Sequence, residues 1–165
     1  MQEEKKVKPA NYYHTGYEQR MASFDLELGS PENMAPQQMA QASLGLSEKY
    51  FKNNPSIDKE SFLSKDSVLF LGDKYAPSLL KIASNNKPIV DFPISDVAHA
   101  LLFSAITTEK MEVAKTVYPI LVIQHNGRWR VLDGFNRLAK AALNGRTKIH
   151  ARVMTYDDIK SCKVS

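Results

Sequence analysis

Short apolar runs alternate with polar turns along the chain, and the pattern is clearest after residue 87. Apolar residues at every second position predict four strands, over residues 88–94, 118–124, 128–132 and 148–154. Apolar residues at helical spacing predict three helices, over residues 95–106, 109–115 and 135–144. Asn126-Gly127 predicts a tight hairpin turn between two of the strands, because both residues tolerate a positive φ. This order of elements indicates an α+β fold, a small mixed β-sheet with packed helices.

The N-terminal part is less regular. Ser30-Pro31-Glu32 is typical of a helix start, and this helix should run to about Phe51, with breaks at Pro36 and Gly45. Further elements are predicted in the same region: helices over 58–64 and 76–85, and a strand over 67–72. The chain therefore divides into a polar arm with scattered aromatic residues, a largely helical region and a C-terminal domain, over residues 1–29, 30–86 and 87–165.

Composition narrows the class of protein. The chain has 165 residues, 43% of them hydrophobic, which is enough for one domain with a real core. Cys162 is the single cysteine, so an internal disulfide and a cysteine metal cluster are excluded. The four histidines lack metal-ligand spacing, and His99 is expected at the edge of the core. No apolar run approaches the length of a membrane span, so we expect a soluble, cytoplasmic protein without a membrane partner.

Positive charge is concentrated near the C-terminus. The whole chain carries +4, but residues 125–152 contain one acid, Asp133, and seven cations: Arg128, Arg130, Arg137, Lys140, Arg146, Lys148 and Arg152. This basic block favours a phosphate-bearing partner, either a nucleotide or a nucleic acid. A solvated surface rich in lysine and arginine is the competing interpretation.

Alternation places cations on one face of two predicted strands. If these strands pair, Arg128 and Arg130 form a basic face with Lys148, His150 and Arg152 that could follow a phosphate backbone. The candidate nucleic-acid-binding residues are Arg128, Arg130, Arg146, Lys148 and Arg152. No aromatic residue is interleaved on that face to stack on bases, which favours an ordinary amphipathic sheet with a basic solvated side.

The junction between the strand over 128–132 and the next helix carries the strongest candidate chemistry. Asp133-Gly134-Phe135-Asn136-Arg137 brings a carboxylate, a glycine and a guanidinium to a helix start. Free helix amides and an arginine make a phosphate cradle, beside which Asp133 could hold Mg²⁺ or orient a hydroxyl, with Lys140 assisting one turn on. The competing interpretation is that Asp133 caps the helix and Arg137 pairs with an acid.

The stretch from about Pro88 to Met154 resembles the ParB/sulfiredoxin-like superfamily. The matching segments are, in order, KPIVDFPI, PILV followed by Gly127 and WRVL, DGFNRLA, and Gly145 followed by residues 149–153. The resemblance implies a site for ATP or CTP with Mg²⁺. It assigns phosphate binding to Arg137 and the metal to Asp133. Combined with the chemistry of the corner, it predicts a catalytic role for Asp133 and a nucleotide site of five residues: Gly134, Phe135, Asn136, Arg137 and Lys140.

Departures from the family limit the activity that the resemblance implies. Phe135 stands where sulfiredoxins have their catalytic cysteine, so sulfiredoxin activity is not expected. Phe135 and Asn136 replace two histidines of the kinase-like members, and only Asp91 and Asp96 are acids near the first strand. The leading hypothesis is a nucleotide-binding protein, an NTPase or phosphotransferase in plasmid, phage or DNA-related processes; a nuclease would need more carboxylates.

The alternative hypothesis is a regulator or inhibitor that kept the fold without the chemistry. It would bind nucleic acid or a protein partner through the basic block and the N-terminal arm. A homodimer is compatible with either hypothesis.

Overall fold

The computed structural model describes residues 34–56, 58, 68–103 and 106–164. The arm over 1–29, the helix start at Ser30 and the helix over 58–64 fall outside these residues, apart from Asp58. The described chain has helices and small sheets in one architecture, which confirms the α+β class.

The main sheet is mixed and has four strands, which run in the order β3-β6-β4-β5. Their bounds are Val90–Pro93 for β3, Ile120–His125 for β4, Arg128–Asp133 for β5 and Lys148–Met154 for β6. β4 is parallel to β6, whereas the β3–β6 and β4–β5 pairs are antiparallel. In the turn between β4 and β5, Asn126 has a φ of 52° and Gly127 a φ of 75°, as the Asn-Gly pair predicted.

The two basic strands, β5 and β6, do not pair, so the condition on which the paired basic face depended is not met. β5 returns directly along β4 through the hairpin and occupies one edge of it. β6 pairs in parallel with the other edge of β4. Parallel neighbours need a crossover connection, and the helix between β5 and β6 provides it.

Helices cover the sheet face formed by Val122, Val131 and Ala151. They are α3 (Pro36–Asn53), α6 (Thr108–Val113) and α7 (Phe135–Leu143). On this face the Phe92 and Trp129 rings meet edge to face, with centroids 4.9 Å apart.

The first described helix, α3, begins at Pro36 and runs through Gly45, so the predicted breaks at these residues are wrong. Proline in the first turn lacks only an amide that would have no partner there, and a Cβ added at Gly45 would meet nothing within 4 Å.

The α-helix predicted over 95–106 is wrong in type. The chain forms two 3₁₀ segments instead, η3 (Ile94–Asp96) and η4 (Ala98–Phe103). Ile94, Val97 and Ala100 are all buried, and their spacing of three matches the three residues per turn of a 3₁₀-helix. The Ser43 hydroxyl of α3 donates to the Leu101 carbonyl at 2.7 Å, which fastens η4 against the helical layer.

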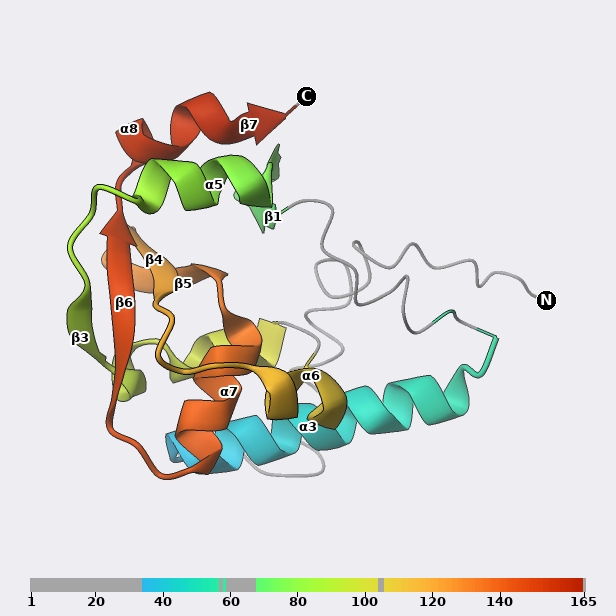
Figure 1. The fold of residues 1–165 in the computed structure, drawn as a ribbon. Coiled ribbons are helices and arrows are strands. Elements are labelled where there is room, and N and C mark those ends of the chain that lie inside the picture. The colour runs from blue at the N-terminus through green and yellow to red at the C-terminus, as the bar shows by residue number, and fades with distance from the viewer. Residues whose placement is uncertain (1–33, 57, 59–67, 104–105, 165) are drawn as a thin grey trace.

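A second layer packs on the opposite face of the sheet, near the C-terminal end of β6 (Figure 1). It comprises a small antiparallel sheet and further helical segments: β1 (Val68–Phe70), β2 (Asp73–Tyr75), β7 (Lys163–Val164), α5 (Pro77–Ser84), α8 (Tyr156–Ile159) and η5 (Lys160–Cys162). Leu121, Leu132 and Met154 belong to its core. No helix in the described ranges is long and apolar enough to cross a membrane.

Candidate functional site

The corner between β5 and α7 is a one-residue turn. Gly134 alone separates the strand from the helix, and its φ is 104°. A Cβ at this position would lie 2.5 Å from Ile120 Cγ2 of β4. Glycine is therefore required both by the backbone conformation and by the close approach of the neighbouring strand. The turn directs the first amides of α7 away from the end of β5.

No side chain caps the start of α7. The N-cap residue is Gly134, so the interpretation that Asp133 caps the helix is wrong. Helix N-termini present amides without intrahelical partners and a partial positive charge. Asn136, in the first turn, has a buried side-chain oxygen for which the described residues supply no hydrogen-bond donor. The corner thus combines a helix start that no side chain caps with one buried acceptor, Asn136 Oδ1.

The Arg137 guanidinium makes one internal hydrogen bond and one longer contact with an acid. One guanidinium nitrogen, Nη1, donates to the Pro119 carbonyl just before β4. The other, Nη2, is 3.8 Å from Asp133 Oδ2, and the two side chains remain 25% and 39% exposed. The interpretation of Arg137 as the partner of an acid is therefore supported at the long end of ion-pair distances. Both side chains are partly exposed, so solvent reaches the guanidinium and the carboxylate at this corner.

Lys140 and Arg146 of the basic block have contacts of their own. Lys140 Nζ donates to the Glu112 carbonyl at 3.0 Å and to the Ala114 carbonyl at 2.9 Å, at the end of α6. Cations at a helix C-terminus stabilise its free carbonyls. Arg146 Nη1 donates to the Thr116 hydroxyl at 3.3 Å. The Lys140 ammonium group therefore stabilises the C-terminal end of α6 in this structure, and Lys140 lies one turn of α7 beyond the corner.

Arg152 is held by the second layer. Its Nη1 donates to the carbonyls of Ser84 at 3.1 Å, Asn85 at 3.3 Å and Lys87, at the end of α5. Lys148, on the same strand, is exposed. The five candidate nucleic-acid residues therefore do not form one continuous surface, because β4 separates Arg128 and Arg130 from the cations of β6.

The corner fits Mg²⁺ only in part. Asp133 supplies one carboxylate, and the described residues contain no group of three or more histidine, cysteine or acidic side chains that could hold a metal ion. Magnesium in phosphate sites commonly uses one or two carboxylates and takes its other ligands from phosphates and water. Asp133 would therefore hold Mg²⁺ together with a bound phosphate, and the metal would neutralise phosphate charge there.

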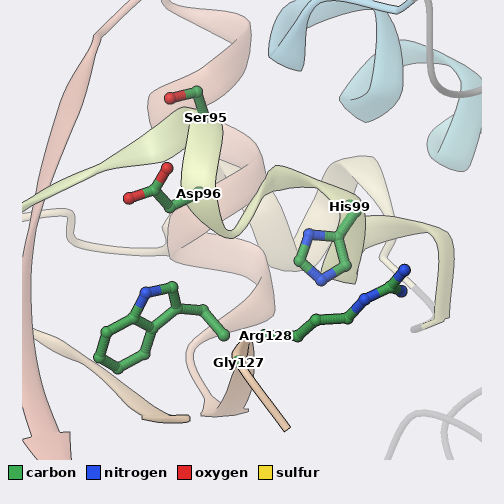
Figure 2. Close-up of a pocket in the computed structure, with 6 residues that line it drawn as sticks. Ser95, Asp96, His99, Gly127 and Arg128 are labelled. Atoms are coloured by element: carbon green, nitrogen blue, oxygen red, sulfur yellow. The ribbon is translucent and has the colours of Figure 1, made fainter. Parts of the chain in front are cut away.

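An open hollow of about 470 Å³ lies at the other end of β5 (Figure 2). It is lined by residues of η3, η4 and the β4–β5 hairpin: Ser95, Asp96, His99, Gly127, Arg128 and Trp129. Figure 2 shows the Ser95 and Asp96 side chains on one side and the His99 and Arg128 side chains on the other. Burial lowers the pKa of His99, and the charges of Arg130 and Arg128 lower it further, against a hydrogen bond to the Trp129 backbone. His99 is therefore neutral near pH 7.

The sequence alone did not predict this hollow. His99 was expected at the edge of the core, and it is partly buried there, but Asp96 and Arg128 are too far apart in sequence for spacing to join them. The sequence predicts the turn at Gly127. It does not predict which residues of η3 and η4 pack beside that turn.

Comparisons of this chain with protein-family models, curated proteins and solved structures found no match. The resemblance to the ParB/sulfiredoxin-like superfamily accordingly stays a prediction, and function is inferred from the geometry of the corner and the hollow.

Proposed function

We propose that this protein binds the phosphate groups of a nucleotide, such as ATP or CTP, at the corner between β5 and α7. The observation that carries the proposal is the uncapped start of a nine-residue helix, with the Arg137 guanidinium beside it. Phosphates bind at such helix starts because free amides and the helix dipole both favour negative charge. A guanidinium adds a charge-assisted, geometrically specific donor.

Electrostatics supports the same proposal. Arg137 is a cation in the first turn of α7, where the helix dipole opposes positive charge by a few tenths of a kcal/mol or more. Asp133 offsets part of this repulsion, but its carboxylate is 3.8 Å away and partly exposed. A phosphate between Arg137 and the first amides of α7 would offset the rest. The Pro119 carbonyl would keep the guanidinium in place for it.

The proposal concerns nucleotide binding, and hydrolysis of the nucleotide or transfer of its phosphate is a separate step. Asp133 would contribute to hydrolysis or phosphoryl transfer by holding Mg²⁺ or by orienting the attacking hydroxyl. It is the single acid between residues 125 and 152. A two-metal nuclease normally requires several carboxylates, and the corner provides one.

The test is isothermal titration of the full chain with ATP, CTP and GTP, with and without Mg²⁺. We expect saturable binding of at least one nucleotide, weakened more than tenfold by Arg137→Ala. Lys81→Ala removes the same charge from the exposed surface of α5 and should leave the affinity unchanged. Thermal unfolding of each variant shows whether loss of the Arg137–Pro119 hydrogen bond has disturbed the fold.

Two results would contradict the proposal. One is the absence of binding by all three nucleotides. The other is an affinity that Arg137→Ala leaves unchanged in a folded variant. Where binding is found, release of inorganic phosphate measured on the same samples decides whether the corner also hydrolyses the nucleotide.

A further inference from the structure

The hollow beside the β4–β5 hairpin offers three kinds of group to a ligand. Arg128 supplies donors and positive charge, Asp96 supplies acceptors and negative charge, and Trp129 supplies an aromatic ring. Arg128 and Asp96 are exposed, and neither their side chains nor that of Arg130 make a hydrogen bond or ion pair within the described ranges. Their polar groups are therefore available to a ligand without breaking an internal contact.

This combination excludes several simple ligands. A phosphate or sulfate bound without a metal ion would meet the Asp96 carboxylate, and a metal ion bound without a phosphate would meet the Arg128 guanidinium. An apolar ligand would leave the charged walls without partners. His99 is neutral near pH 7 because of its burial and of the two arginines, so it adds a hydrogen-bonding ring without adding charge.

We propose that this hollow receives an unpaired nucleobase of a single-stranded nucleic acid. A base carries donors and acceptors along its edges, which can meet Asp96 on one side of the hollow and Arg128 on the other, and a π-face that can lie against Trp129. Single strands are the form in which bases are free to leave the stack and enter such a site. The volume of about 470 Å³ exceeds the need of one small ion and falls in the range of ligand pockets.

The flanking backbone of the strand would lie near Arg128 and Arg130. Arg128 lines the hollow, and Arg130 follows it by two residues on β5, so that both side chains leave the strand on the same face. Cations next to an aromatic ring are the usual composition of single-strand sites, where stacking contributes per base and phosphates add salt-dependent affinity. The proposal does not depend on the corner: Arg128 and Asp133 are five residues apart along β5, about 17 Å at the usual rise of a strand.

Trp129 provides a direct reporter, because it is the single tryptophan of the chain. The first measurement is tryptophan fluorescence of the full chain during titration with a 12-nucleotide single strand of mixed sequence. Three other ligands serve for comparison: the matching duplex, an abasic strand of the same length, and the mononucleotides. We expect the single strand to quench Trp129 and to bind at least tenfold more tightly than the duplex or a mononucleotide. The abasic strand should bind weakly without quenching.

Asp96→Ala separates base recognition from charge attraction, because the two predict opposite signs. If Asp96 accepts a hydrogen bond from a base, the variant should bind the single strand at least fivefold more weakly. If only charge matters, removal of a carboxylate should tighten the binding of any polyanion, the abasic strand included. Arg128→Ala should weaken the single strand at least tenfold, and Lys81→Ala, with the same charge change on α5, should not.

Several outcomes would overturn the proposal. They are the absence of single-strand binding, binding without Trp129 quenching, and tighter or unchanged binding by Asp96→Ala. Equal affinity for a mononucleotide would overturn the assignment to a strand. Nucleotide titration reports on the corner and Trp129 quenching by the single strand reports on the hollow, so failure at one site is distinguished from failure at the other in the same set of proteins.

Discussion

The two ends of β5 use their polar groups in different ways. At the C-terminal end, Arg137 is bonded to the Pro119 carbonyl and lies near Asp133, and Lys140 is bonded to two carbonyls of α6. At the N-terminal end, Arg128 and Asp96 face a hollow without internal hydrogen bonds among the described residues. The same basic block therefore stabilises the fold at one end and offers free charge at the other.

The difference between the two ends means that a local excess of cations does not by itself define a binding surface. Charged hydrogen bonds to carbonyls stabilise a fold by about 1.5–3 kcal/mol each when they are shielded from water. Cations whose donors are all used in this way are costly to redirect to a ligand. Arg137 differs from them, because its second guanidinium nitrogen has only the 3.8 Å contact with Asp133 Oδ2. Stability measurements can therefore distinguish the two groups before any ligand is known.

The largest loss of stability is expected for Gly134→Ala at the structured end. The new Cβ would lie 2.5 Å from Ile120 Cγ2, and an L-residue is strained at a φ of 104°. Overpacking and left-handed strain together should cost about 3 kcal/mol, measured as the free energy of unfolding in urea. Gly145→Ala is the matched control, since its φ is 74° and its Cβ would meet nothing within 4 Å. Its cost should be about 1 kcal/mol, and equal losses would show that packing against Ile120 is unimportant.

Arg152→Met should give the next largest effect. The variant keeps an apolar stem but loses the hydrogen bonds to the carbonyls of Ser84, Asn85 and Lys87, which hold the end of α5 on β6. The expected loss is about 2 kcal/mol in urea unfolding. Arg128→Met, the control from the other end of β5, should change stability by less than about 0.5 kcal/mol. A loss at Arg128 as large as at Arg152 would remove the distinction between engaged and free cations.

The C-terminal elements could be predicted because their local signals agree. Asn126-Gly127 requires a turn with positive φ, and the alternation of Ile149, Ala151 and Val153 buries one face of β6. Thr107 caps α6 by accepting from the Lys110 amide, and threonine is a common residue at this position. At such positions the short-range chemistry and the final packing favour the same structure.

Other features depend on packing that the sequence does not reveal. The segment over 94–103 has helical apolar spacing, yet burial of Ile94, Val97 and Ala100 is met by 3₁₀ turns. β2 and β7 have only three and two residues, too few for alternation to show. The corner could be predicted because its residues are contiguous in sequence. The hollow could not, because it joins residues of η3 and η4 to a hairpin that is distant in sequence.

Lys140→Met tests the engaged cations beyond the corner itself. The variant would leave the carbonyls of Glu112 and Ala114 without their shared donor at the end of α6. Lys140 is partly exposed, so water replaces part of the interaction, and the expected loss is about 1 kcal/mol in urea unfolding. Lys81→Met, which removes an exposed lysine from α5, should have almost no effect. If both variants are neutral, the hydrogen bonds of Lys140 contribute nothing and its charge is free after all.

The smallest effect concerns pH and the other end of β5. Burial and the two arginines lower the pKa of His99 below its usual value of 6.5, so the folded state takes up a proton less readily than the unfolded state. The contribution of neutral His99 is complete above pH 6.5 and is lost as pH falls through the lower folded-state value. The free energy of unfolding, measured between pH 7.5 and 5, should therefore fall less steeply for His99→Gln than for the wild type. Arg128→Ala removes one of the two charges and should reduce the slope by a smaller amount. An unchanged slope in His99→Gln would mean that the imidazole is solvated and that the hollow does not hold it neutral.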